Sequence, residues 1–231
     1  MNKRSWAVYS TVAALTFLAH SPAYAQGQNE VTRLERATSV LHEIDRIPEK
    51  SIPPALLRHA QGVAVIPNVI KVGFIIGGRT GKGVLVVRRP NGRFSDPVFI
   101  RITGGSIGWQ AGVQSTDVVL VFKTRRSIEG LMHGTFTLGV GASVAAGPVG
   151  RNAEAATNAQ LKAEIFSYSR SRGLFAGVAL DGSKLDVDQA ADAAFYGPGL
   201  TPEDIIAGRV SHVPAVATGF TREVQAAQAA H

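Results

Sequence analysis

A serine set between glycines is the first candidate for chemistry in this chain. Gly104-Gly105-Ser106-Ile107-Gly108 matches the G-x-S-x-G pattern, in which a sharp turn from a strand into a helix exposes a nucleophilic serine hydroxyl. Such an elbow needs a helix directly after the serine, but Gly108 and Gly112 are poor helix formers. Small and bulkier residues instead alternate up to Val113, as in a strand with one face stripped of bulk. We therefore expect a strand here, with a hydrolase that uses Ser106 as the alternative.

Motifs for cofactors and metal ions do not fit this sequence. The glycine-rich segment 77–83 has Ile76 where a phosphate-binding loop needs glycine, and Gly83 where it needs a hydroxyl. The histidines show no H-E-x-x-H spacing, and the aspartates near residue 186 lack the register of a calcium-binding loop. We expect no cofactor, no metal ion, no catalytic residue and no enzymatic activity.

Clustered cations are the second candidate for chemistry. From Arg58 to Arg126 the chain has eleven basic residues and two acidic ones, which suits a negatively charged partner. Nucleic acid is not favoured, because Phe94 and Trp109 are too few for a base-stacking platform. Near an anionic lipid surface each cation contributes about 1 kcal/mol, whereas the alternative is that the cations only protect outward strand faces. The predicted lipid-binding residues are Lys71, Arg79, Lys82, Arg88, Arg89, Arg93, Lys123, Arg125 and Arg126.

The N-terminus has the features of an export signal. Met1-Asn2-Lys3-Arg4 is basic, Ala7 to Ala19 is largely apolar, and Ala23-Tyr24-Ala25 has the small-x-small pattern of a cleavage site. The apolar run is shorter than the roughly 20 residues that cross a bilayer, and the 231-residue chain has no cysteine to carry a lipid anchor. We expect a signal peptide over residues 1–25, cleavage near Ala25-Gln26, and an exported protein that is periplasmic or extracellular.

The rest of the chain divides into helical ends and a β-rich middle. Helical spacing from Val31 predicts an amphipathic helix that ends near Pro48, and Ser51 is a candidate cap for a short second helix. From Gly62 to about Gly150, short apolar runs between glycines predict strands. The clearest runs are residues 63–66, 72–76, 84–87, 98–102, 107–113 and 118–122, with a turn predicted at 90–93.

The later part of the chain predicts further strands and then helices. Small residues alternate again from Gly139 to Gly147, and two strands follow over 163–169 and 173–180. Helices are predicted over 188–195, from Thr201, and over 213–231, where the alternative is a frayed tail. Strands this close in sequence favour antiparallel pairing. We therefore expect an α+β fold: a curved, mostly antiparallel β-sheet, barrel-like or sandwich-like, with N- and C-terminal helices packed on it.

Several segments in order resemble the SYLF domain, also called the Ysc84 lipid- or actin-binding domain. They include Leu56 to Pro67, Phe94-Ser95-Asp96-Pro97, Gly104 to Gly112, Ile165 to Ser169 and Phe195-Tyr196-Gly197. The resemblance runs from about Val31 to Gly197 and implies one domain over residues 26–212. Related domains bind phosphoinositide-like headgroups, and some bind actin filaments. Phe94 stands where the family commonly has tryptophan, and the N-terminal helix carries as many acids as bases.

These observations together predict a non-enzymatic protein that binds anionic phospholipid, either at a membrane surface or around one lipid molecule. We expect an exported member of bacterial type, for which actin is not a partner. The alternative is a structural or protein-interaction module of the cell envelope that uses the same sheet for protein contacts. The glycine-lined strand faces leave room for tight backbone packing or for an acyl chain.

Overall fold

The computed structural model describes residues 22–45, 52–134, 136–149, 162–171 and 174–229. Most of the predicted leader, residues 1–21, therefore lies outside the described residues. The helices are α1 (Pro22–Asp45), α2 (Pro54–His59), α3 (Arg125–Met132), α5 (Gln189–Tyr196), α6 (Pro202–Ala207) and α7 (Ala215–Ala227). The strands are β1 (Gly62–Val87), β2 (Val98–Phe122), β3 (Phe136–Thr137), β4 (Val144–Ala146), β5 (Ile165–Ser171), β6 (Leu174–Gly177) and β7 (Lys184–Val187).

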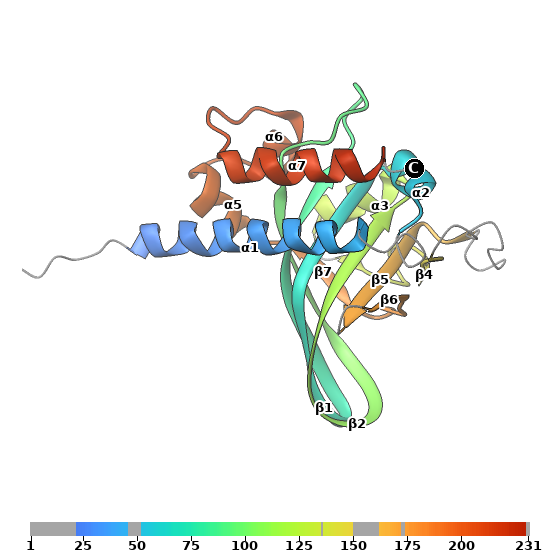
Figure 1. Cartoon of the computed structure of the whole chain (residues 1–231). Helices are drawn as coiled ribbons and strands as arrows, with labels where there is room; N and C mark the ends of the chain where they lie inside the picture. Colours follow the sequence, from blue (N-terminus) through green and yellow to red (C-terminus); the bar gives the residue numbers. More distant parts are fainter. Residues whose placement is uncertain (1–21, 46–51, 135, 150–161, 172–173, 230–231) are drawn as a thin grey trace, which may run out of the picture.

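The seven strands form one curled sheet with β2 at its centre. The order is β3-β7-β2-β5-β4, with β1 also paired to β2 and β6 to β5. All these pairs are antiparallel except β4 with β5. The predicted α+β fold is confirmed: the sheet is a half-barrel, mostly antiparallel, and helices from both ends of the chain pack on it (Figure 1).

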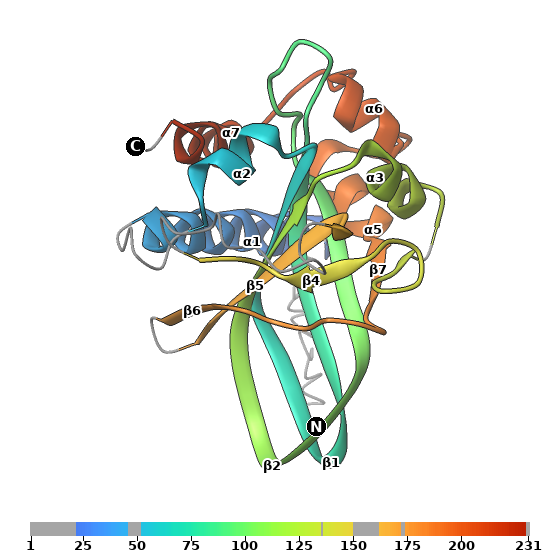
Figure 2. The same ribbon diagram turned by 90° about the vertical axis from the view of Figure 1, so that its right-hand side faces the viewer.

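The six short strands predicted between residues 63 and 122 join into the two long strands β1 and β2. Their register begins with Gly62 opposite Phe122 and ends with Leu85 opposite Val98. Both strands double back near their midpoints and project well beyond the body of the molecule, as Figures 1 and 2 show. We call the projecting part, residues 69–81 of β1 and 102–116 of β2, the ribbon.

Glycines allow the two halves of β1 to approach closely. A Cβ atom at Gly83 would overlap the carbonyl oxygen of Val65, and one at Gly77 would overlap that of Val72. Because no side chain fits there, these two glycines of β1 serve tight backbone packing. The side chains of residues 106–112 lie outside the described residues.

The second alternating run, Gly139 to Gly147, is not the continuous strand that we predicted. Gly139 has φ +85°, and residues 139–141 form a turn closed by a hydrogen bond from Gly139 N to Ala142 O. Only Val144–Ala146 is a strand. Strand β7, which pairs with both β2 and β3, was not predicted, because its four residues are too few to show a period.

The sheet buries apolar side chains on both faces. Val65 and Phe99 belong to a core shared with Leu34 of α1 and Phe220 of α7. Their strand neighbours face the opposite core, which includes Leu131 of α3. Because β1 and β2 are buried on both sides at this level, they read as continuous apolar runs. The C-terminal segment is a helix, as one of the two alternatives predicted, and it contributes to the first core.

Candidate functional site

The nine predicted lipid-binding cations do not form one patch. Lys71, Arg79 and Lys82 lie on or beside the ribbon. The other six, Arg88, Arg89, Arg93, Lys123, Arg125 and Arg126, lie at the end of the molecule away from the ribbon. We call the loop 88–97, the ends of α2, α6 and α7 that contact it, and the adjoining residues 123–126 at the start of α3 the junction.

Arg88 holds the junction together. Its Nε donates to the carbonyl oxygen of Ala60 at 2.6 Å, and its Nη2 donates to that of Leu57 at 3.0 Å and to the side-chain oxygen of Gln228 at 2.9 Å. Its Nη1 donates to the oxygen of Gly92 at 2.8 Å, and the guanidinium lies 4.5 Å from the centre of the Phe94 ring. All three nitrogens are therefore engaged within the protein. Arg88 thus connects α2, α7 and its own loop, and its role in lipid binding stays a prediction.

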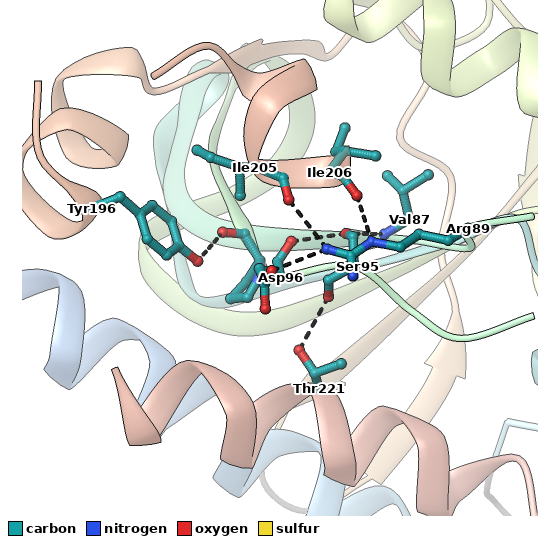
Figure 3. A network of polar contacts seen from close by, with 9 residues as sticks. Val87, Arg89, Ser95, Asp96, Tyr196, Ile205, Ile206 and Thr221 are labelled. Atoms are coloured by element: carbon teal, nitrogen blue, oxygen red, sulfur yellow. Dashed lines mark hydrogen bonds and ion pairs between the residues drawn. The ribbon is translucent and has the colours of Figure 1, made fainter. Parts of the chain in front are cut away.

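Arg89 is engaged in the same way. Its Nε donates to the carbonyl oxygen of Ile206 at 2.6 Å, and its Nη2 pairs with the Asp96 carboxylate at 3.0 Å (Figure 3). The Ser95 hydroxyl accepts from the amide of Val87 at 3.0 Å and donates to the Asp96 carbonyl at 2.8 Å. The polar groups of the Phe94-Ser95-Asp96-Pro97 segment and of Arg89 thus hydrogen-bond within their own loop and to helix α6.

Two further hydrogen bonds tie this segment to helices α5 and α7. The hydroxyl of Tyr196 donates to the carbonyl oxygen of Pro97 at 2.7 Å, and the hydroxyl of Thr221 donates to that of Ser95 at 3.2 Å (Figure 3). Burial raises the pKa of the Tyr196 phenol, so this donor stays protonated. The Phe94-Ser95-Asp96-Pro97 segment, one of those that resemble the SYLF domain, therefore connects the loop to these helices.

The remaining cations of the junction differ in exposure. Arg93, Arg125 and Arg126 are exposed, and Nη2 of Arg125 donates to the backbone oxygen of Arg88 at 2.9 Å. This bond brings the two predicted basic clusters together at the junction. Lys123 is half-buried, with its ammonium 4.9 Å from the centre of the Phe166 ring.

The ribbon exposes apolar side chains. Val113 is 71% exposed, Val72 is 51% exposed and Ile70 is 42% exposed. Val72 and Val113 are directly opposite in the ladder, and Ile70 lies two residues before Val72, so all three lie on one face. Contiguous exposed apolar side chains on a protruding element are typical of an interaction surface.

Two cations lie near this apolar face. Lys71 is half-buried, and because it lies between Ile70 and Val72 in β1 its side chain projects from the opposite face; no described residue pairs with it. Burial lowers the pKa of the Arg79 guanidinium, and its Nε is buried without a hydrogen-bond partner among the described residues. These groups retain the capacity to bind an anion.

Ser106 does not lie at a nucleophile elbow. Strand β2 runs without a break from Val98 to Phe122, and Ser106 is paired with Gly77 in its middle. No helix follows the serine, so the backbone lacks the strand-to-helix turn on which the G-x-S-x-G chemistry depends.

A polar pocket of about 640 Å³ lies beside the base of the ribbon, between α1, β1 and α5. Its lining includes Glu30, Arg33, Arg36, Lys82 and Asp188, of which only Lys82 was predicted to bind a ligand. Helical spacing offered a signal for Glu30, because it lies four residues before buried Leu34 on the same stripe of α1. Asp188, one of the aspartates that lack the register of a calcium-binding loop, is buried at the start of α5.

Arg33 joins the carboxylates of this pocket. Its Nη2 lies 2.9 Å from Oε1 of Glu30 and its Nη1 lies 3.5 Å from Oδ2 of Asp188. The guanidinium also lies 5.1 Å from the centre of the Phe99 ring. The second carboxylate oxygen of Glu30 is buried and has no hydrogen-bond partner among the described residues.

Asp192 is a further buried acid behind the pocket. Its Oδ1 accepts a hydrogen bond from the Phe99 amide at 2.9 Å, while its Oδ2 has no described partner. Burial raises the pKa of this carboxyl to about 7, with a smaller contribution from the charge of Asp188.

In the described part of the chain, no helix combines the length and apolar character needed to cross a membrane.

Comparison with known proteins assigns the chain to a family. Residues 103–227 match the family model Ysc84, described as "Las17-binding protein actin regulator". This match extends beyond Gly197, where the predicted resemblance ended.

Named relatives agree with the family match. "LAS seventeen-binding protein 3" of Saccharomyces cerevisiae is 41% identical over 171 residues, which cover 73% of this chain and 37% of the relative. "SH3 domain-containing YSC84-like protein 1" of Homo sapiens is 36% identical over 186 residues, which cover 78% of this chain and 54% of the relative. The chain thus spans about a third to about half of these proteins. As the resemblance predicted, the chain belongs to the Ysc84, or SYLF, family.

Proposed function

We propose that this protein is a non-enzymatic binding protein for membranes that contain anionic phospholipid, and that the ribbon makes the contact. The observation that carries the proposal is the exposed apolar face of Ile70, Val72 and Val113 on an element that projects from the body. Burying one such side chain fully in an apolar medium is worth about 1.5–3 kcal/mol. Inserting this face below the lipid headgroups would therefore supply a large part of the binding free energy.

Cations beside this face account for a preference for anionic lipid. Lys71 lies between two of the exposed apolar residues along β1, with its side chain on the other face of the ribbon. Arg79 lies in the second half of β1, with its Nε buried and without a described partner. Each cation held near an anionic surface adds about 1 kcal/mol.

The junction is not part of this contact. Loop 88–97 and the ribbon lie at opposite ends of the molecule (Figures 1 and 2), so one flat membrane cannot touch both. Of the nine predicted cations, the proposal therefore retains Lys71, Arg79 and Lys82, and assigns the junction cations to folding and solubility.

Vesicle flotation tests the proposal. The protein is mixed with vesicles of phosphatidylcholine alone or with phosphatidylglycerol added, over a series of salt concentrations. We expect binding that needs the anionic lipid, weakens as salt rises, and falls at least about tenfold in the double variant Val72→Ser/Val113→Ser. Val140→Ser is the matched control, because Val140 is 84% exposed but lies in the turn 139–141, away from the ribbon.

Two results would overturn this proposal. One is binding that is indifferent to both lipid charge and salt. The other is an equal loss of binding in the Val72/Val113 and Val140 variants, since that would show no special role for the ribbon.

A second candidate function is protein binding. The family description "Las17-binding protein actin regulator" favours a partner of the actin machinery, so our expectation that actin is not a partner receives no support from the relatives. Co-sedimentation with actin filaments, in the absence of lipid, tests this candidate. Saturable co-sedimentation that the ribbon variants leave unchanged would place protein binding on another surface.

Two further parts of the proposal concern processing and activity. We propose that residues 1–25 direct export, which sequencing the N-terminus of the mature protein would test by a start near Gln26. We also propose that the protein does not hydrolyse esters. Turnover of ester substrates by the wild type that is lost in Ser106→Ala would contradict this.

A further inference from the structure

We propose that the pocket between α1, β1 and α5 binds a headgroup that carries both an ammonium and a phosphate, of the phosphoethanolamine class. This inference shares Ile70 and Lys82 with the ribbon proposal but rests mainly on the buried group of Glu30, Arg33 and Asp188, so it can be tested separately. At about 640 Å³ the pocket has the size of a small-ligand site.

The inner wall of the pocket is negatively charged. Glu30, Arg33 and Asp188 are all buried, with exposed fractions of 5%, 8% and 7%. Arg33 contacts both carboxylates, so the ionised group carries a net charge of −1, from two acids and one base. A buried cluster with an uncompensated negative charge is costly unless a cation joins it.

One atom of this cluster, in a residue that lines the pocket, is buried without a described partner. Oε1 of Glu30 binds Arg33 at 2.9 Å, but Oε2 is buried and accepts no hydrogen bond from a described residue. A carboxylate oxygen is an acceptor only, so it needs a donor from the ligand. A primary ammonium supplies three N–H donors and also the missing positive charge.

The mouth of the pocket has the opposite charge. Arg36 and Lys82 line it and are exposed, and neither is paired with a described residue. Burial raises the pKa of the Glu30 carboxyl, and the nearby charges of Arg33 and, to a smaller extent, Lys82 act in the opposite direction. The pocket is therefore dipolar, negative inside and positive at its mouth, which fits a zwitterion that enters with its ammonium first and leaves its phosphate between the two cations.

The remaining lining fits the rest of such a molecule. Asn29, Thr32, Asn68 and Thr80 offer neutral hydrogen-bonding groups. Ile70 lines the pocket and also belongs to the exposed apolar face of the ribbon. A lipid whose headgroup occupies the pocket could therefore lay its apolar part along the ribbon, although free phosphoethanolamine has the same recognition chemistry.

Titration of the soluble headgroup tests the pocket without any membrane. Phosphoethanolamine, phosphocholine and inorganic phosphate are each titrated into the protein and followed by calorimetry or by NMR shifts. Phosphocholine lacks N–H donors, so we expect it to bind at least about tenfold more weakly than phosphoethanolamine. We expect Glu30→Gln and Lys82→Gln to weaken phosphoethanolamine about tenfold and about fivefold, and Arg222→Gln, an exposed charge on α7, to change nothing.

Lys82→Gln keeps the test valid if Glu30→Gln fails to fold, because Lys82 is exposed. Vesicles of phosphatidylcholine with and without phosphatidylethanolamine, both neutral, then identify the source of the headgroup. Binding that phosphatidylethanolamine enhances and Lys82→Gln reduces would support a lipid ligand, whereas soluble binding without vesicle enhancement would support a free metabolite.

Equal affinity for phosphoethanolamine, phosphocholine and phosphate would overturn the inference, as would no response in either the soluble or the vesicle arm. These failures are distinct from failure of the ribbon proposal. That proposal is measured with anionic lipid and with the Val72/Val113 variant, which leaves the charged groups of the pocket intact.

Discussion

At the junction, Arg88 donates hydrogen bonds from all three guanidinium nitrogens, whereas on the ribbon Nε of Arg79 is buried with no partner among the described residues. Both arginines come from one basic segment of the sequence. Their surroundings differ, because helices pack around the junction whereas the ribbon extends away from the body (Figure 1).

The same contrast holds for the other buried polar groups. The described side-chain atoms that are buried without a partner are Glu30 Oε2, Arg79 Nε, Ser183 Oγ and Asp192 Oδ2. None of them belongs to the junction. Leaving a buried polar group unpaired costs about 1–3 kcal/mol, so its retention beside a pocket and a projecting ribbon points to ligand binding. We therefore propose that the junction stabilises the fold and that the ribbon side binds the ligand.

The largest effect on stability is expected at the base of the ribbon, where the two halves of β1 pack against each other. Gly83→Ala would place a Cβ against the Val65 carbonyl oxygen, and we expect it to lower the free energy of unfolding by about 3 kcal/mol or more. Gly105→Ala is the matched control, because a Cβ there has no atom within 4 Å. Urea unfolding of both variants checks this. Equal stability would show that the two halves of β1 are not in close contact.

Arg88→Ala would test the structural role of the junction. It removes four hydrogen bonds and the contact with the Phe94 ring, and we expect a loss of about 2–3 kcal/mol in unfolding free energy. Arg93→Ala should cost less than about 0.5 kcal/mol, since Arg93 is exposed. If Arg88→Ala keeps its stability but loses vesicle binding, the contrast between junction and ribbon is wrong.

Asp192 predicts a dependence of stability on pH. Burial raises its pKa to about 7, above that of an unfolded aspartate, so the folded state binds the proton more tightly. The stabilisation that Asp192 adds to the free energy of unfolding is complete below about pH 4 and is lost as pH rises through about 7. We expect the unfolding free energy of the wild type to fall over this range, relative to Asp192→Asn. Parallel pH profiles of the two proteins would contradict the shift.

Lys71 should give the smallest effect. Lys71→Gln removes one cation from the ribbon and should weaken binding to anionic vesicles by about 1 kcal/mol, or about fivefold, at low salt. Its stability should not change, because no described residue pairs with it. Arg126→Gln is the control at the junction. A larger loss of vesicle binding in that variant would show that the membrane contact lies at the junction and not on the ribbon.

Local patterns in the sequence were sufficient for most elements of the fold. Helix α6 follows from its cap: Thr201 and Asp204 form the capping box that their spacing predicts. The turn at 90–93 is closed by backbone hydrogen bonds between Arg89 and Arg93 and between Gly92 and Arg89. The prediction of a strand from Gly139 to Gly147 was wrong. The same alternation of small residues also allows a turn, because glycine can adopt the positive φ that Gly139 has.

Residue order and composition are enough to predict the family, the α+β class and the concentration of cations between Arg58 and Arg126. Which of these cations are paired depends on the folded chain. Arg88 finds its acceptors on Leu57 and Gln228, which are distant in the chain. The pocket likewise brings Glu30 and Asp188 together from opposite ends. Long-range contacts set burial and partners, and these determine what a charged side chain can do.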